Sequence, residues 1–175
     1  MHFLLLTWNP GPLDDHVFTP DQWNDRLVAP YLRGETVTTS WGVGRHVNNL
    51  EPGDVAFLYR QGQWGRGIVA RGVLRSQPWP APNQARGGRI TNHVDVEWRE
   101  AVPTDLAIDV DELEALAPEF GWRQVYSSGR QLPVATGERL SREWQEHVES
   151  GLRSPSCAGA GCSSDPASSS RPRPA

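Results

Sequence analysis

The chain has 175 residues, which is enough for one domain with a full hydrophobic core and short for two. Its formal net charge of -4 argues against a protein that coats nucleic acid regardless of sequence. Charge is nevertheless segregated, because no Asp or Glu occurs from Val55 to Val94, a segment that holds Arg60, Arg66, Arg71, Arg75, Arg86 and Arg89. A segment of that sign suits phosphate groups.

The first part of the chain predicts a buried strand, a helix and a pair of strands. The apolar run Met1–Leu6 precedes a proline-rich loop and indicates the strand. A helix is expected to begin after Thr19, which is followed by a proline and a capping-box glutamine, and to end at Ala29-Pro30. The turn Leu50-Glu51-Pro52-Gly53-Asp54 leads into an apolar strand whose expected partner follows it, namely Val55–Tyr59 and Gly67–Leu74.

The second part predicts short strands with helices beside them. Four segments carry this expectation: a long loop at Ser76–Thr91, a half-exposed strand at His93–Arg99, a helix from Asp109 to about Leu116, and a helix from Ser141 to near Ser150. Two further short strands are expected on either side of the turn Ser127-Ser128-Gly129, at Trp122–Tyr126 and Arg130–Pro133. This pattern is typical of a small mixed barrel.

We expect residues 1–150 to form the one folded domain, followed by a disordered tail at 151–175 that is rich in Ser, Pro, Gly and Ala. Cys157 and Cys162 both lie in that tail, so no disulfide framework is expected. The histidines lack ligand spacing, which predicts no metal and no cofactor. The apolar run Phe3–Leu6 is too short for a signal peptide, and a cytoplasmic location is therefore expected.

Four motifs in one order resemble a known family. They are LLLTWNP at Leu4–Pro10, Trp41-Gly42, the turn at Leu50–Asp54, and Arg66-Gly67-Ile68. From Met1 to about Val148 the chain resembles the EVE domains of the PUA-like superfamily, to which the YTH readers of methylated adenine in RNA also belong. The similarity is greatest to the EVE-type domains that stand ahead of HNH nuclease domains in modification-dependent restriction enzymes. It implies an α+β fold, a small mixed PUA-like β-barrel with flanking helices.

The resemblance also implies a pocket for a flipped base. Its aromatic walls would be Trp41, Trp64 and Trp8, and the side chains able to hydrogen-bond the base edge would be Thr7, Asn9 and Ser40. Tryptophan is more often a core residue than a pocket wall, and we expect core positions for Trp23, Trp98, Trp122 and Trp144. Asn9-Pro10 is also an ordinary start of a turn.

A base can enter such a pocket only if the flanking phosphates are held. The residues expected to hold them are Arg45, His46, Arg60, Arg66, Ser128 and Arg130. For each arginine the alternative is an ordinary solvated surface position.

The function expected from these residues is recognition of a modified base, foremost 5-methyl- or 5-hydroxymethylcytosine in DNA, as the recognition module of a modification-dependent restriction system. DNA with modified cytosine is the expected partner, together with a nuclease domain or subunit. The sequence contains no nucleophile motif and no His–Asn–His constellation after Gly151, so a binding module rather than an enzyme is expected. The alternatives are an RNA reader of the YTH type, an unrecognised nuclease, and a protein-interaction module whose tryptophans are all core.

Overall fold

The structure is a computed structural model that describes residues 1–10, 18–44, 49–62, 65–83 and 87–152. In these ranges the strands are β1 (Phe3–Trp8), β2 (Val37–Gly44), β3 (Val55–Arg60), β4 (Gly67–Leu74), β5 (Trp79–Asn83), β6 (Arg89–Ala101), β7 (Ile108–Asp109) and β8 (Arg130–Leu132). The helices are α1 (Pro20–Trp23), α2 (Ala29–Leu32), α3 (Val110–Leu116) and α4 (Val134–Leu152). A π-helical turn at Asn24–Val28 joins α1 to α2, and short 3-10 turns lie at Thr104–Leu106, Pro118–Phe120 and Trp122–Gln124.

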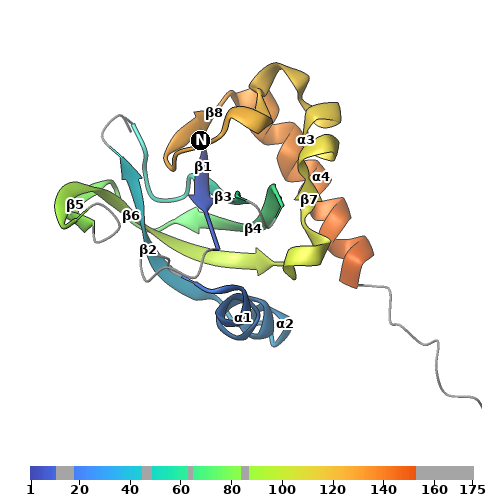
Figure 1. Ribbon diagram of the computed structural model, residues 1–175, viewed down its shortest axis with the longest axis horizontal. Coiled ribbons are helices and arrows are strands. Elements are labelled where there is room, and N and C mark those ends of the chain that lie inside the picture. The colour runs from blue at the N-terminus through green and yellow to red at the C-terminus, as the bar shows by residue number, and fades with distance from the viewer. Residues whose placement is uncertain (11–17, 45–48, 63–64, 84–86, 153–175) are drawn as a thin grey trace, which may run out of the picture.

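The strands form one curled, mixed sheet in the order β2-β6-β4-β3-β1-β8, with β5 paired to β6 and β7 to β4. β1 and β3 are parallel, whereas β3 and β4, the strand pair that the sequence predicts, are antiparallel. The sheet curves into a half-barrel, with α3 and α4 beside it (Figure 1). The expected α+β class, with a small mixed barrel and flanking helices, is confirmed.

The curled sheet separates two hydrophobic cores. The inner core lies within the half-barrel and includes Leu4, Leu6 and Trp8 of β1. The outer core lies under α3 and α4 and includes Phe3 and Leu5, the alternate residues of the same strand. α4 approaches β1 closely because Gly137 faces Phe3, where a side chain would overlap the ring.

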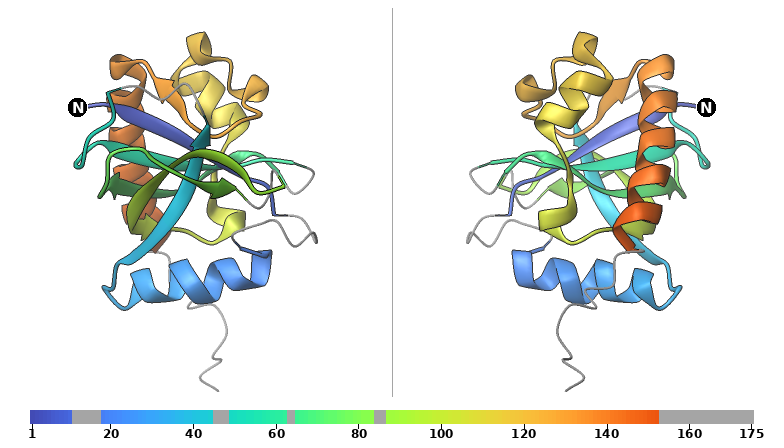
Figure 2. Two further views of the ribbon diagram at one scale, coloured as in Figure 1. Left: turned by 90° about the vertical axis from the view of Figure 1, so that its left-hand side faces the viewer. Right: turned by 90° about the vertical axis from the view of Figure 1, so that its right-hand side faces the viewer.

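The first helical segment covers an end of the half-barrel (Figures 1 and 2). Thr19 caps α1 with the predicted capping box. The helix does not end before Pro30, which is a correction, because the chain continues through the π-helical turn into α2. In that turn the Ala29 N–H donates to the Asn24 carbonyl, so the hydrogen-bond register changes just before the proline and the missing N–H of Pro30 is tolerated.

The long loop expected at Ser76–Thr91 is wrong, because much of it forms a two-stranded ribbon of β5 and the start of β6. β5 contains Pro80 and Pro82, which argue against a strand in the interior of a sheet. β5 lies at an edge and pairs with β6 alone among the described strands. On an edge strand, a proline can occupy a position whose N–H would face solvent, so no hydrogen bond of the sheet is lost. The strand expected at His93–Arg99 lies within the longer β6.

The last third of the described chain holds two more corrections. Trp122 begins a 3-10 turn rather than a strand, since Gly121 before it is left-handed with φ of 69° and the Trp122 indole donates to the Ala117 carbonyl at 3.0 Å. α4 begins at Val134, earlier than expected, because its buried stripe starts at Thr136 and Gly137, which do not read as apolar residues. The region 153–175, where the tail is expected, lies outside the described residues. Among the helices described, none is long and apolar enough to cross a membrane.

Asp54 fastens the start of β1 to the turn before β3. Its carboxylate accepts hydrogen bonds from the backbone N–H of His2 at 2.6 Å and of Glu51 at 2.9 Å, and it lies 3.2 Å from the His2 imidazole. Burial raises the pKa of Asp54, but these hydrogen bonds and the nearby imidazole lower it by more, so the net shift is downward. The charged carboxylate therefore stabilises the parallel pairing of β1 with β3.

We predict that Asp54→Asn lowers the free energy of unfolding at neutral pH by about 1.5–3 kcal/mol, the usual contribution of hydrogen bonds to a charged group. Because the pKa of Asp54 is depressed in the folded state, its stabilisation is present above the unfolded pKa near ~4 and is lost as pH falls through the folded value. Denaturant unfolding at pH 7 and pH 3 should show a smaller difference between variant and parent at pH 3 than at pH 7. Asp25→Asn, at an exposed position, is the control. A difference that is equal at both pH values would contradict the role of the charge.

Candidate nucleic-acid interface

The carboxyl ends of β1 and β3 lie together at one edge of the half-barrel, because parallel strands end at the same side of a sheet. Thr7 is in register with Tyr59, and Trp8 with Arg60. The Gln61 N–H donates to the Trp8 carbonyl at 2.8 Å, which extends the pairing past the strand. Asn9, the next residue, is exposed.

Ser128 joins this group from a distant part of the sequence. Its hydroxyl accepts a hydrogen bond from the Thr7 N–H at 3.2 Å. The neighbouring Gly129 has φ of 89° and donates its N–H to the Leu5 carbonyl at 3.0 Å. A side chain on Gly129 would overlap the backbone of Val43 in β2, so the chain can pass between β1 and β2 only because this residue is glycine. Together, Thr7, Trp8, Asn9, Arg60 and Ser128 are called here the strand-end cluster.

Arg60 is a charged group with little compensation. It continues the row Ala56 and Leu58 on β3, which faces the inner core. Its Nε is buried and has no hydrogen-bond partner, and no described carboxylate forms an ion pair with it. Burial lowers the pKa of the Arg60 guanidinium, an effect that the charge of Asp105 opposes. The group nevertheless stays protonated, as arginine does in proteins, and is available to an anion.

The tryptophans expected at the pocket lie in a continuous aromatic cluster. The Trp8 ring stacks on Trp23 with centroids 4.7 Å apart, and its indole donates to the Phe18 carbonyl at 2.9 Å. The Phe18 ring lies 6.4 Å from Trp41, which meets Trp98 edge-on at 5.9 Å. Trp8 is 2% exposed and Trp41 5% exposed. Neither ring is the partly exposed wall of an open pocket in this structure.

Trp41 differs from the other buried tryptophans in one respect. The indole N–H groups of the others donate to oxygen atoms, as is usual for buried tryptophan, at Trp8, Trp23, Trp98, Trp122 and Trp144. The Trp41 indole has no hydrogen bond to any residue that the structure describes. Its donor is therefore not committed to another described part of the fold.

The structure does not bring Ser40 together with Trp41. Side chains alternate along β2, so buried Trp41 faces the inner core while exposed Ser40 lies on the opposite face, in register with Asp95. Three other expected site residues, Trp64, Arg45 and His46, lie outside the described residues.

Arg66 and Arg130 are occupied by contacts within the protein. Arg66 donates to the Arg123 carbonyl and its guanidinium lies 5.4 Å from the centre of the Tyr126 ring. Burial raises the pKa of Tyr59 to about 12, although the positive charges of Arg66 and Arg123 oppose this shift. Arg130 donates to the Phe120 carbonyl at 3.3 Å and lies 4.3 Å over that ring.

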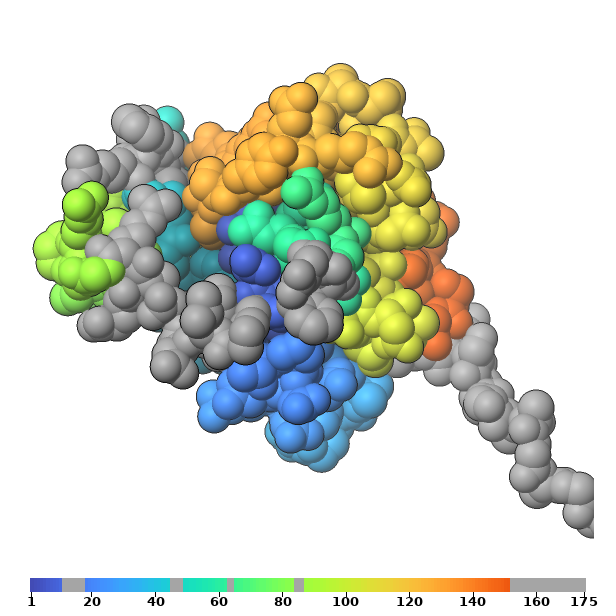
Figure 3. All heavy atoms as spheres, in the orientation of Figure 1, coloured from blue at the N-terminus to red at the C-terminus, as the bar shows by residue number. Residues whose placement is uncertain are grey.

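Figure 3 views the face on which the carboxyl end of β1 is visible. The end of β1, in dark blue, lies near its centre, with the green segment around the end of β3 and the orange segment before β8 beside it. The light-green ribbon of β5 and β6 forms one margin of this face.

Sequence reasoning missed an aromatic pair on the outer side of that ribbon. Trp79 is 38% exposed and its ring lies 5.6 Å from the His93 imidazole. Gly42 of β2 lies beneath, where an added Cβ would be 3.0 Å from the Asn83 amide. The prolines around Trp79 argue against a strand in the sequence, and only the pairing of β5 with β6 in the structure shows the strand that positions this ring.

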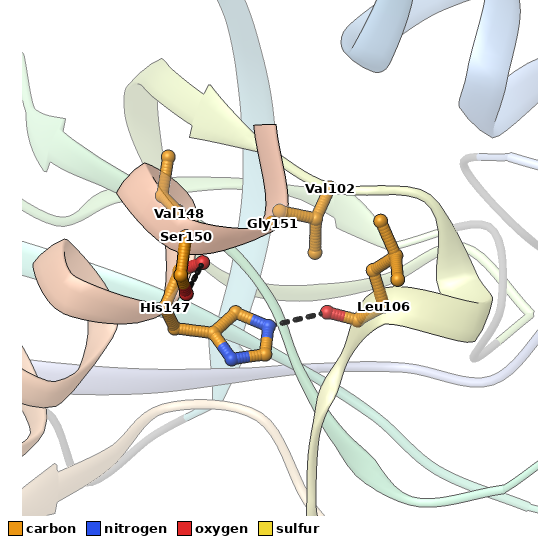
Figure 4. A pocket seen from close by; sticks show the side chains of 6 residues that line it. All are labelled: Val102, Leu106, His147, Val148, Ser150 and Gly151. Atoms are coloured by element: carbon orange, nitrogen blue, oxygen red, sulfur yellow. Dashed lines mark hydrogen bonds between the residues drawn. The ribbon is translucent and has the colours of Figure 1, made fainter. Parts of the chain in front are cut away.

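A separate hollow lies at the C-terminal end of α4, lined by Val102, Leu106, His147, Val148, Ser150 and Gly151 (Figure 4). The His147 Nε2 lies 2.6 Å from the Leu106 carbonyl oxygen, so its polar group already has a partner. The remaining lining is mainly apolar and does not suit phosphate. No group of three or more His, Cys, Asp or Glu side chains within the described ranges could hold a metal ion.

No family model and no curated protein matches the sequence. Solved structures share the fold. A hypothetical protein from Leishmania major has a TM-score of 0.55 at 14% identity, over 86% of this chain and 97% of that chain. The human THYN1 protein, in complex with DNA that contains 5-methylcytosine, has a TM-score of 0.53 at 14% identity, over 84% of this chain and 98% of that chain. At these identities the likeness establishes the fold, a small mixed α+β barrel with flanking helices.

We predict that Trp41→Ala lowers the free energy of unfolding by about 3–5 kcal/mol, because a buried ring leaves a cavity. Trp98→Ala, which removes the ring that Trp41 meets edge-on, is the reference for a core residue and should cost a similar amount. Urea unfolding of both variants measures the difference. A loss below about 1 kcal/mol for Trp41→Ala would show that its ring is a movable pocket wall.

Trp41→Phe separates packing from hydrogen bonding. It keeps an aromatic ring and removes an indole N–H that has no described partner, so stability should fall less than in Trp98→Phe, which also loses the bond to Thr39 at 2.8 Å.

Proposed function

We propose that this chain binds DNA that carries a modified cytosine, foremost 5-methyl- or 5-hydroxymethylcytosine, and holds the extruded base at the strand-end cluster. Arg60 is the single observation that carries this proposal. A partly buried guanidinium whose Nε has no described hydrogen-bond partner is costly to the free protein, and a bound phosphate or base edge would compensate the charge. The human THYN1 protein, which has a similar fold, was solved with DNA containing 5-methylcytosine and supports the choice of ligand.

In this proposal the side chains have separate roles. Arg60 binds a phosphate beside the extruded nucleotide, and Asn9 and Thr7 hydrogen-bond the base edge. Trp41 contributes a stacking surface and an indole N–H that has no described partner, which requires Phe18 to move, since that ring lies 6.4 Å away. Trp64, Trp8 and Ser40 remain predicted pocket residues, and Arg45, His46, Arg66, Ser128 and Arg130 remain predicted phosphate contacts.

The proposed biological role is the recognition module of a modification-dependent restriction system, with DNA cleavage by a separate nuclease domain or subunit. The chain itself acts as a binding module. Incubation of modified plasmid with the chain and Mg²⁺ tests this part, since cleavage would contradict it.

We predict that the protein prefers a duplex with 5-methyl- or 5-hydroxymethylcytosine over the same duplex with cytosine, N6-methyladenine or an RNA strand. One methyl group is expected to discriminate by about 1–3 kcal/mol, because it fills apolar space without a new hydrogen bond. The slope of log affinity against log salt should correspond to about three to five phosphate contacts, at ~0.9 each. Fluorescence anisotropy with matched oligonucleotides measures both quantities. Equal affinity for modified and plain duplexes would contradict the proposal, and tighter binding to methylated RNA would favour an RNA reader.

We predict that Arg60→Gln weakens binding by about 1.5–3 kcal/mol while leaving the folded state as stable as before or more so. Loss of this phosphate contact should also reduce the slope of log affinity against log salt by about 0.9. Arg139→Ala on α4, which removes an arginine paired with Glu119, is the control and should leave binding unchanged. If Arg60→Gln unfolds the protein instead, the guanidinium has a structural role and the site assignment is wrong.

A further inference from the structure

An exposed isoleucine lies near the turn of the ribbon formed by β5 and β6. Ile90 is 58% exposed, although isoleucine is among the residue types most often buried. It pairs with Pro82 across the ribbon. The ribbon of β5 and the start of β6 extends from the body of the half-barrel to the margin of the molecule (Figure 1).

Strand alternation determines which way Ile90 faces. Alternate residues of β6 share a face, and Val94 and Val96 on the face of Ile90 are buried in the inner core. His93 lies on the other face, against Trp79. Ile90 therefore projects from the side of the ribbon that continues the inside of the half-barrel.

The ribbon adjoins the strand-end cluster through β2. Asn92 of β6 is in register with Gly44 of β2. A Cβ on Gly44 would lie 3.9 Å from the Ser128 carbonyl oxygen, and the Ser128 hydroxyl binds the Thr7 N–H. The light-green ribbon accordingly borders the face on which the end of β1 is visible (Figure 3).

The composition of the ribbon restricts the kind of partner. Pro80 and Pro82 remove N–H donors from β5, which disfavours the addition of another strand at this edge. The segment 76–94 contains no Asp or Glu, and Arg89 beside Ile90 is exposed. A ribbon without acidic residues that carries an exposed arginine and an exposed isoleucine fits a DNA duplex, whose phosphates surround an apolar base stack.

We propose that Ile90 inserts into the base stack where the modified base is extruded, and that Arg89, on the other face of β6, binds a phosphate of the flanking backbone. This inference rests on the proposed function. Extrusion leaves a gap in the stack, and apolar wedges of this type fill or open such steps in other DNA-binding proteins. Ile90 thus favours the extruded state of a paired base, whereas the strand-end cluster holds the base itself.

The test compares two duplexes with the same modified cytosine, one with guanine opposite and one with an abasic site opposite. Ile90→Ser should lose at least about tenfold in affinity for the paired duplex and stay within about twofold of the parent on the abasic duplex, where extrusion no longer breaks a base pair. Leu32→Ser is the matched control, because Leu32 is 60% exposed but lies on α2, and it should change neither affinity.

Each outcome of this experiment is decisive. Equal losses on the two duplexes, or no loss on either, would overturn the wedge while the proposed function stands. If the parent chain does not prefer the modified duplex over a plain one, the proposed function fails instead. Near-ultraviolet circular dichroism of Ile90→Ser should match the parent, since an exposed side chain is replaced.

Discussion

Strand β1 has no exposed face, and the arrangement of the site depends on this constraint. Leu4, Leu6 and Trp8 must fill the inner core while Phe3 and Leu5 fill the outer core, so a shift of one residue would exchange the two sets. Parallel pairing with β3 then brings the carboxyl ends of both strands to one edge. Asp54 holds the opposite ends in register through the N–H groups of His2 and Glu51, far from the residues that it positions.

That register places a charge where packing alone would favour an apolar residue. Most arginines with described ion pairs are on the surface, among them Arg33, Arg75, Arg99 and Arg123, and such exposed pairs contribute little to stability. Arg60 instead continues an inward-facing row after Ala56 and Leu58, where its Nε is buried without a partner. Partial burial of an unpaired cation costs folding free energy, and a bound anion can recover it. The position of Arg60 therefore lowers the stability of the free protein, which is the basis of the proposed anion contact.

The sequence predicted what local chemistry determines. Both capping boxes, at Thr19 and Asp109, depend on residues within one helical turn, and both helices begin there. It could not predict the exposure of Trp41, because the glycine beside it suggests an open setting while Phe18 and Trp98 come from distant segments. β5 was missed for a related reason: a strand that contains prolines is acceptable only at an edge, and the pairing order that creates the edge is a property of the whole sheet. Within the candidate site, the sequence could not predict that Trp8 lies beside Arg60, because this depends on the parallel pairing of β1 with β3.

The energetics of base extrusion connect these separate features. Unstacking a paired base costs a few kcal/mol, and stacking on an aromatic ring returns ~1–3 kcal/mol. Trp8 and Trp41 are 2% and 5% exposed, so a base that stacks on either must displace side chains already packed there, and the net gain is smaller than for an open pocket. In the proposed complex, the difference must come from other groups: the Arg60 guanidinium, whose Nε has no described partner, would bind an anion, and exposed Ile90 would contact the opened stack. Under the proposed function, selectivity for a modified cytosine would depend on the shape of the space that a displaced Phe18 leaves.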